Sequence, residues 1–276
     1  FAYRENGVTN GIRTISNHEF FIKLGQVLID ILQTPTHEGI VFRVDMRLRP
    51  NGDSGPLALS FDAMDHYFLT HGRDWERYAL IKARPVAGDV AAGHDLLASL
   101  RPFVYRKYLD FGAFESIRTM RTLIERELNK KSLTGNVKLG RGGIREIEFI
   151  VQSHQLIYGG RNPTLRTSSL YDALAALEDN GVLTDHDCAM MRRHYDFLRV
   201  LEHRLQIMDD AQTHTVPVEP LARTRIALTM GYPGINAFDT AVESVNDAVH
   251  RLFLTVFHQD RGPAASENNT LFADIW

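Results

Sequence analysis

Helical periodicity is the feature that most constrains this chain. From about residue 61 onward, apolar residues recur at helical spacing, and Gly, Pro, Asn or Thr residues separate the periodic segments. No strong strand pattern follows about residue 90. We therefore expect the last two-thirds of the chain to be a helical bundle. The pattern predicts helices near 61–70, 73–84, 93–103, 112–131, 144–158, 169–180, 185–212, 219–230 and 236–259.

The first third of the chain has a mixed pattern. Residues 16–33 predict an amphipathic helix that Pro35 ends. Ile40–Leu48 alternates apolar and charged residues, which predicts a strand, and Pro50–Pro56 is typical of a tight loop. Leu57–Ser60 is expected to return as a short strand. The predicted fold class is mainly α with a small α+β part. The charged face of the longer strand consists of Arg43, Asp45, Arg47 and Arg49.

Composition excludes several classes of protein. The net charge is -3, so no strong global field draws the chain to nucleic acid or to a membrane surface. No apolar run approaches the roughly 20 residues that span a bilayer, and Phe1–Arg4 does not begin a signal peptide. The lone Cys188 cannot form an internal disulfide and fits a reducing cytoplasm. A cytoplasmic protein with neither a nucleic-acid nor a membrane partner is expected.

The strongest candidate site lies on the predicted strand and the loop after it. Period-two geometry places Asp45, Arg47 and Arg49 on one strand face. A carboxylate can hold a hard cation, and guanidinium forks can grip phosphate oxygens. The loop Gly52–Gly55 can bring backbone N–H groups close to an anion. The alternative is an Asp–Arg ladder on a solvated strand.

A second candidate is the segment 72–84, which predicts a helix rich in charge. Lys82 and Arg84 could reach a nucleotide phosphate. The alternative is ordinary surface charge around a buried Trp75.

A third candidate is the glycine-rich segment Lys138–Phe149. Glycines that lead into a helix can leave free N–H groups at its positive end, which is suited to an anion. The segment follows no strand and lacks the Lys-Ser/Thr of a P-loop. The alternative is a glycine turn before a helix on which Arg145 and Glu146 form a salt bridge.

Two further polar groups are interpreted as structural. Asp185 and Asp187 follow Thr184 at an expected helix start, where acidic residues complement the helix dipole. Glu202 and its neighbours lie within a long predicted helix, and ion pairing is their expected role. The twelve His residues show no zinc-type spacing.

Taken in order, these segments resemble the glutamine synthetase adenylyltransferase family. The likeness runs from residue 1 to about residue 258, and several long motifs in the right order make it specific. The segments that carry it are Phe42–Leu57, Arg73–Arg84, Gly142–Phe149, Leu201–Gln206 and Gln212–Pro217.

This resemblance implies a fold and an activity. The family is similar to polymerase-β-type nucleotidyltransferases, with a helical domain after each catalytic core. Residues 1–105 would be the C-terminal part of a truncated core, 106–260 the helical domain, and 261–276 a linker or the start of the next region. The family removes AMP from a tyrosine of glutamine synthetase by phosphorolysis, which gives ADP, and attaches AMP from ATP in a second unit. Gly72–Tyr78 looks like the adenylyl-removing unit.

The resemblance also implies roles for particular residues. Asp45 would be a catalytic metal ligand, and Arg145 and Glu146 would face an interdomain cleft. The implied cofactor is Mg²⁺, the implied substrates and products are ATP, ADP and phosphate, and the implied partners are glutamine synthetase and the PII signal protein. The implied nucleotide or phosphate contacts are Arg47, Arg49, Ser54, Gly55, Lys82 and Arg84.

One departure from the family pattern affects the expected activity. The family's core opens with a Gly-Ser or Ser-Ser pair followed by Asp-x-Asp, which binds two magnesium ions, and no such segment precedes Asp45. Phe1–Tyr3 looks like the sequence just after that motif. The chain is therefore expected to be a fragment that is inactive alone, because two-metal chemistry needs ligands that bridge both ions.

Two alternative functions stay open. The helical part could be a non-catalytic module that docks glutamine synthetase or the PII signal protein. The chain could also come from the related uridylyltransferase of PII, although no sign of that enzyme's downstream regulatory domains is seen.

Overall fold

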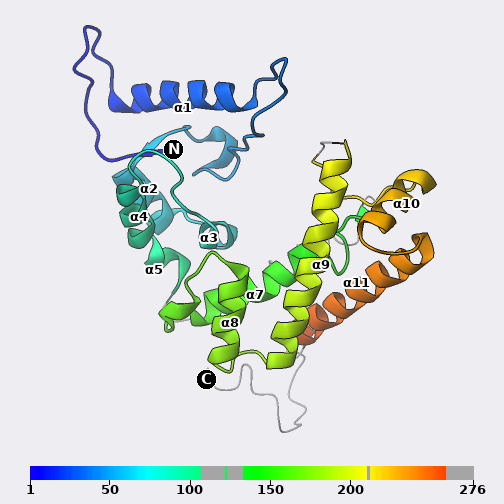
Figure 1. The fold of residues 1–276 in the computed structure, drawn as a ribbon. Helices are drawn as coiled ribbons and strands as arrows, with labels where there is room; N and C mark the ends of the chain where they lie inside the picture. The colour runs from blue at the N-terminus through cyan, green and yellow to red at the C-terminus, as the bar shows by residue number, and fades with distance from the viewer. Residues whose placement is uncertain (107–121, 123–132, 210–211, 259–276) are drawn as a thin grey trace. The chain divides into compact units, whose positions relative to one another are not determined.

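The described part of the chain is mainly helical, as the sequence predicted (Figure 1). A computed structural model describes residues 1–106, 122, 133–209 and 212–258. The chain divides into two compact units, Phe1–Lys107 and Tyr108–Trp276. Within the described residues, no helix is both long enough and apolar enough to cross a membrane.

The first unit places short helices around a small aromatic core. Tyr67, Phe68 and Leu100 are buried together, and Met64 and Phe103 pack against them. A pair of two-residue parallel strands lies beside α2, with Ala2 opposite Leu59. The elements are β1 (Ala2–Tyr3), α1 (Asn17–Gln33), η1 (Gly52–Ser54), β2 (Leu59–Ser60), α2 (Phe61–Thr70), α3 (Asp74–Ile81), α4 (Val90–Ser99) and α5 (Arg101–Val104).

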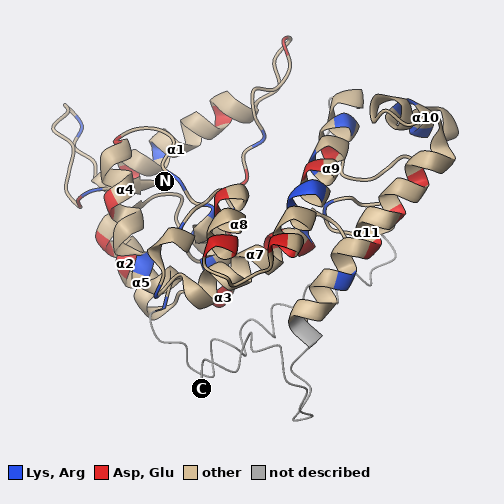
Figure 2. Cartoon of the chain, turned by 60° about the horizontal axis from the view of Figure 1, so that its bottom comes forward, with Lys and Arg blue, Asp and Glu red and all other residues tan. Residues whose placement is uncertain are grey.

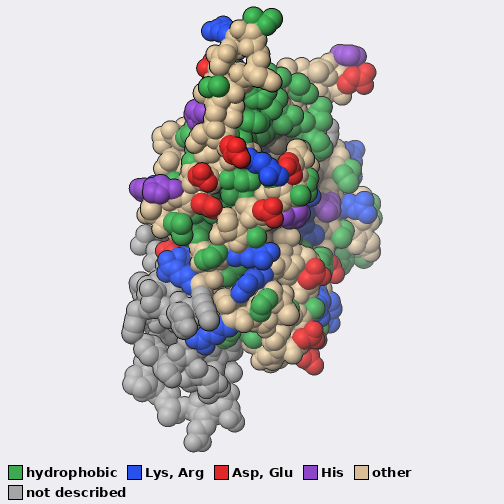
Figure 3. Space-filling view, turned by 90° about the vertical axis from the view of Figure 1, so that its left-hand side faces the viewer, with side chains coloured by type: hydrophobic (Ala, Val, Ile, Leu, Met, Phe, Trp, Pro, Cys, Tyr) green, Lys and Arg blue, Asp and Glu red, His purple; other side chains and the backbone are tan. Residues whose placement is uncertain are grey.

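Helix α1 begins and ends where the sequence predicted. The Ser16 side chain accepts a hydrogen bond from the Glu19 N–H, which caps the first turn. The apolar stripe of α1 is exposed, whereas a surface helix usually turns such a stripe to the core. Hydrophobic side chains gather at the height of α1 in the space-filling view (Figure 3). The exposed members of the stripe are Phe20, Leu24, Val27, Leu28 and Ile31.

The prediction of a strand at Ile40–Leu48 is wrong. These residues form an irregular segment, in which Phe42 and Leu48 are exposed. Alternation sets the two faces of a strand, but a strand also needs a neighbouring backbone with which to share hydrogen bonds. Within this segment the Phe42 N–H instead donates to the Leu32 carbonyl at the end of α1, at 2.8 Å. The short returning strand is present as β2, at Leu59–Ser60.

The helix predicted near 93–103 is two helices, α4 and α5. The break falls at Leu100, which is buried. Pro102 then occupies the first turn of α5, where its missing N–H costs nothing. In one continuous helix the same proline would remove a backbone hydrogen bond.

The second unit is built on α7 (Ile144–Tyr158), which packs against α8 (Leu170–Asp179), α9 (Asp185–Asp209) and α11 (Ile235–His258). The other elements among the described residues of this unit are η3 (Pro163–Leu165) and α10 (Pro220–Thr229). Leucines that recur at helical spacing on α8 and α9 form part of the core of this unit. These buried leucines are Leu170, Leu174, Leu177, Leu198, Leu201 and Leu205.

Not every predicted helix of this unit can be compared. The helix expected near 112–131 lies outside the described residues, apart from Thr122. The other predicted helices of the unit match α7 to α11 to within a few residues at each end.

Amide hydrogen exchange should separate the two units. We expect the central amides of α7, such as those of Ile147 and Ile150, to exchange slowly, because their helix is buried on several sides. Apart from the Phe42 amide, which donates to Leu32, the amides of Ile40–Leu48 should exchange orders of magnitude faster, because that segment has no strand partner. Mass spectrometry after proteolysis measures both. Slow exchange along Ile40–Leu48 would contradict the irregular structure of the segment.

Candidate functional site

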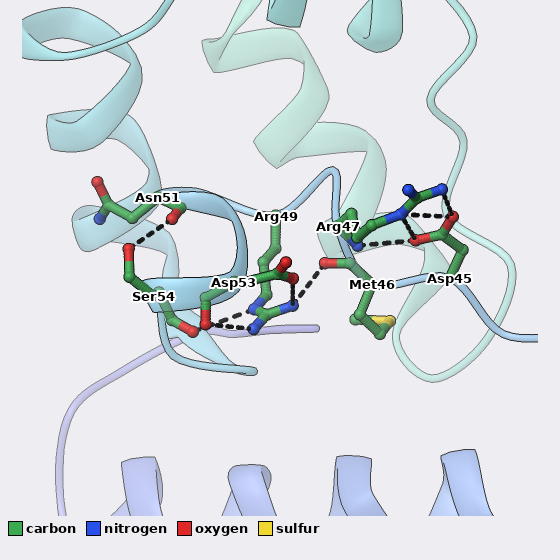
Figure 4. A network of polar contacts seen from close by, with 8 residues as sticks. Asp45, Met46, Arg47, Arg49, Asn51, Asp53 and Ser54 are labelled. Atoms are coloured by element: carbon green, nitrogen blue, oxygen red, sulfur yellow. Dashed lines mark hydrogen bonds and ion pairs between the residues drawn. The ribbon is translucent and has the colours of Figure 1, made fainter.

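Asp45 and Arg47 form a close ion pair on the first unit. Arg47 Nε lies 3.0 Å from both carboxylate oxygens of Asp45, and Arg47 Nη2 lies 2.6 Å from Oδ2. The Arg47 backbone N–H also donates to Oδ1 at 3.0 Å. The pair therefore closes a local turn, and both side chains remain exposed (Figure 4).

This pairing fixes the charge of Asp45. Hydrogen bonds from the Arg47 side chain, and then from its backbone N–H, hold the pKa of Asp45 at about 2. The carboxylate is thus ionised throughout the neutral range. Asp45 and Arg47 lie close together, as predicted, but they meet in a turn and not on the face of a strand.

Arg49 has a different environment from Arg47. Its guanidinium is mostly buried and donates to three backbone carbonyls, at Met46 (2.7 Å), Gly55 (3.0 Å) and Asp53 (3.1 Å). Figure 4 shows the Arg49 guanidinium and its hydrogen bonds within the loop. In this arrangement Arg49 shapes the loop, and its donors are not directed at a phosphate.

The loop after Arg49 is closed on itself. Ser54 Oγ donates to the Asn51 carbonyl at 2.8 Å, and the Gly55 N–H donates to the Gly52 carbonyl at 3.1 Å. A side chain at Gly55 would lie 1.9 Å from the Pro50 carbonyl oxygen, so only glycine fits there. These two groups, predicted to contact phosphate, serve the fold of the loop in this conformation.

The expected magnesium site is not formed by the described residues. Both oxygens of Asp45 are held by Arg47. Magnesium demands near-octahedral oxygen ligands and dehydrates reluctantly, so one carboxylate that is already paired is a poor ligand set. Across residues 1–106, 122, 133–209 and 212–258, no group of three or more His, Cys, Asp or Glu side chains could hold a metal ion.

The segment 72–84 buries charge and not its tryptophan. Glu76 and Arg77 are buried, whereas Trp75 is only half-buried. The Tyr67 hydroxyl donates to Glu76 at 2.9 Å, which ties α2 to α3. Lys82 caps the C-terminus of α3 and Arg84 is exposed beyond it, and contact of either residue with a nucleotide stays a prediction.

The glycine-rich segment before α7 does not offer its N–H groups to an anion. The N–H groups of Gly143, Ile144 and Arg145 donate to the carbonyls of Gly140, Val137 and Lys138, all at 3.0 Å. The preceding loop therefore satisfies the donors that usually make a helix N-terminus an anion site. The glycine turn is the correct interpretation of this segment.

Glu146 lies inside the second unit and is fully buried. His250 Nδ1 on α11 lies 3.1 Å from Glu146 Oε1, so the expected salt bridge with Arg145 is not the one formed. Burial raises the pKa of Glu146, against the opposing effects of the Gly142 N–H and His250. Arg145 is exposed, and its role at an interdomain cleft stays a prediction.

Glu202 on α9 collects basic groups from three segments of the second unit. Its Oε1 lies 3.5 Å from Lys138 Nζ and 3.0 Å from His214 Nδ1, and its Oε2 lies 2.5 Å from Arg199 Nη1. The sequence predicted ion pairing for Glu202 but neither Lys138 nor His214 as a partner. The three partners come from three separate polar segments of the sequence. The sequence does not show that these segments meet in the fold, so it could not have predicted the group.

Comparisons with known proteins agree with these motifs. Residues 1–99 match the family described as glutamate-ammonia ligase adenylyltransferase, and residues 118–257 match the one described as GlnD PII-uridylyltransferase. The two matches cover separate parts of the chain, and the second is the longer. The description of the first family names an adenylyltransferase of glutamate-ammonia ligase.

Relatives extend the match over the whole chain. The chain is 49% identical to the bifunctional glutamine synthetase adenylyltransferase/adenylyl-removing enzyme of Hahella chejuensis, over 98% of this chain and 28% of that protein. It is also 49% identical to the enzyme of the same name from Nitrosococcus oceani, over 100% of this chain and 29% of that protein. The chain belongs to the glutamine synthetase adenylyltransferase family, and it spans less than a third of the length of these relatives.

Replacing Arg47 by Gln should release Asp45 from its partner. We expect the pKa of Asp45 to rise from about 2 toward its ordinary value near 4, because the charged hydrogen bonds are lost. Asp45 would then be protonated at a higher pH than in the wild type. Carbonyl ¹³C NMR of a pH titration measures this, with Asp53 as the internal control. An Asp45 that already titrates near pH 4 in the wild type would contradict the pair.

Proposed function

We propose that this chain is part of an enzyme that controls glutamine synthetase by reversible adenylylation of a tyrosine. The observation that carries the proposal is the match over 98% to 100% of the chain to relatives whose names state both the adenylylating and the adenylyl-removing activity. The enzyme class follows from the family. Its substrates and partners are proposed here for this chain.

We assign the chain to the unit that removes AMP. The reaction would be phosphorolysis, in which a phosphate oxygen attacks the phosphorus of adenylyl-tyrosine. The bond from that phosphorus to the tyrosine oxygen breaks, its electron pair stays on the tyrosine oxygen, and a proton completes the free tyrosine. The products are ADP and unmodified glutamine synthetase. Support for this unit is the resemblance of Gly72–Tyr78 to the adenylyl-removing sequence.

The residues of the first unit would contribute charge and shape. Arg47 is exposed beside the ionised Asp45, so its guanidinium is held in place while its outer edge can meet a phosphate oxygen. Arg49 positions the loop through its three backbone carbonyls. A positive group fixed near the transferring phosphorus stabilises the negative charge of the transition state. Magnesium stays an expectation from the family.

A second candidate function concerns the helical unit. Residues 118–257 match a family described by its action on PII, so this unit could dock the PII signal protein, or glutamine synthetase, without chemistry. Turnover that depends on a residue of the first unit distinguishes the enzyme from such a module.

The test uses a chimera in which the residues that precede the matched segment in the Hahella chejuensis relative are joined to this chain. Adenylylated glutamine synthetase, phosphate and magnesium are supplied, and ADP release is measured. We expect turnover by the chimera and none above the blank by residues 1–276 alone, since no Asp-x-Asp precedes Asp45. Asp45→Asn in the chimera should lower turnover about 100-fold or more, as the loss of one fixed electrostatic group does elsewhere.

The matched control is Asp53→Asn, which removes one carboxylate from the same loop. Asp53 is exposed and lies 3.8 Å from Arg49, so its loss should leave turnover within about twofold of the parent chimera. Equal turnover by Asp45→Asn and the parent would show that Asp45 is part of a surface ladder. ADP release by residues 1–276 alone would refute the expected inactivity.

A further inference from the structure

Basic side chains outnumber the carboxylate that they share at Glu202. Lys138 and His214 meet one of its oxygens, and Arg199 meets the other. A second imidazole extends the group, because Arg199 Nη2 donates to His203 Nε2 at 3.3 Å. Two permanent positive charges and two imidazoles thus surround a single negative charge.

The carboxylate is hidden while the basic groups remain accessible. The Glu202 side chain is only 2% exposed, compared with 40% for Lys138, 35% for Arg199 and 26% for His214. All three contact the same buried group, so their accessible parts lie close together. An ion from solvent would therefore meet positive groups first.

Two further carboxylates near Arg199 have other hydrogen-bond donors among the described residues. Asp196 accepts a hydrogen bond from the Tyr171 hydroxyl at 2.5 Å, and Glu148 accepts one from Tyr195 at 3.4 Å. Among the acidic side chains that the structure describes, only Glu202 forms an ion pair with Lys138 or Arg199. Burial lowers the pKa of His214, and the nearby Lys138 lowers it further, as a crowded positive environment does.

Other polar contacts in the same unit are balanced, which sets the Glu202 group apart. Arg141 pairs with Asp247 at 2.6 Å, one charge against one, and His250 faces Glu146. If Glu202 served only to join two parts of the fold, one positively charged partner would be enough to balance its charge. Figure 2 shows that basic and acidic residues both recur along α9.

We propose that Lys138, Arg199 and His214 form a phosphate-binding site on the helical unit, with His203 at its edge. The buried carboxylate of Glu202 positions these side chains. The ligand class is a phosphate group, either inorganic phosphate or the terminal phosphate of a nucleotide. A phosphate dianion matches two permanent cations and imidazoles that can donate. The site lies within the second unit and does not depend on the chemistry proposed for the first.

The test is a titration of the 276-residue chain followed by NMR of the imidazole nitrogens. Inorganic phosphate is added at pH 7 and constant ionic strength, with sodium chloride as the screening control. We expect saturable shifts at His214 and His203, with the ring of His214 moving toward its protonated form. His250, paired with Glu146, serves as the internal control and should not respond.

Matched variants decide whether the named residues are responsible. Lys138→Gln and Arg199→Gln should each raise the dissociation constant for phosphate about tenfold or more, because each loses a charge-assisted hydrogen bond. Arg141→Gln removes one positive charge from the same loop and should leave the constant unchanged. If one variant fails to fold, the other carries the comparison, and amide spectra report folding.

The result that overturns the site is the absence of saturable shifts in the wild type. It is equally overturned if Lys138→Gln and Arg199→Gln bind phosphate as Arg141→Gln does, which would show general charge screening. Parallel titrations with ADP distinguish the two sources of the phosphate group. Tighter binding of ADP assigns the site to a nucleotide, and equal or weaker binding assigns it to free phosphate.

Discussion

A carboxylate can be buried only if other groups replace the water that it loses, and the second unit is organised around this constraint. Glu202 is buried on α9 and binds Lys138 from the glycine loop and His214 from the segment after α9. Glu146, buried at the start of α7, faces His250 on α11. The first contact ties the glycine loop to α9, and the second ties α7 to α11. The loop in turn caps the first turn of α7 with its own carbonyls.

The same constraint explains why several motifs that carry the family resemblance are rich in charge. Each places an acidic side chain where it is buried, at Glu76, Glu146 and Glu202. Every one of them meets a partner from a different element: Tyr67, His250 and Lys138 respectively. These motifs therefore bear on packing as well as chemistry, and a charged motif alone does not identify a catalytic site.

Much of the helical architecture could be predicted from the sequence, because an amphipathic helix carries its own hydrogen bonds and its own periodicity. Leu174 and Leu198 lie on such helices, and both are fully buried. The strand at Ile40–Leu48 could not be predicted correctly from alternation, since its existence depends on a partner that alternation does not specify. Pro102 divided a helix that periodicity had joined.

The candidate site was predictable only in part. Asp45 and Arg47 do meet, because residues two apart can close a turn as well as share a strand face. Arg49 has the same residue type and spacing, yet its guanidinium turns inward to three carbonyls. That difference depends on the path of the loop, which Gly55 permits through its close approach to Pro50. Likewise, two partners of Glu202, Lys138 and His214, lie far from it in the sequence, beyond any local pattern.

The measurement that tests this account most directly is the free energy of unfolding of Glu202→Gln, obtained from urea titrations followed by circular dichroism. Removal of the buried charge would leave Lys138, Arg199 and His214 facing one another. We expect a loss of roughly 2–4 kcal/mol, somewhat below the value for a fully buried pair because the cations are partly exposed. The control is Glu243→Gln on the exposed side of α11, which should change stability by less than about 0.5 kcal/mol. Equal effects of the two substitutions would contradict the central role of Glu202.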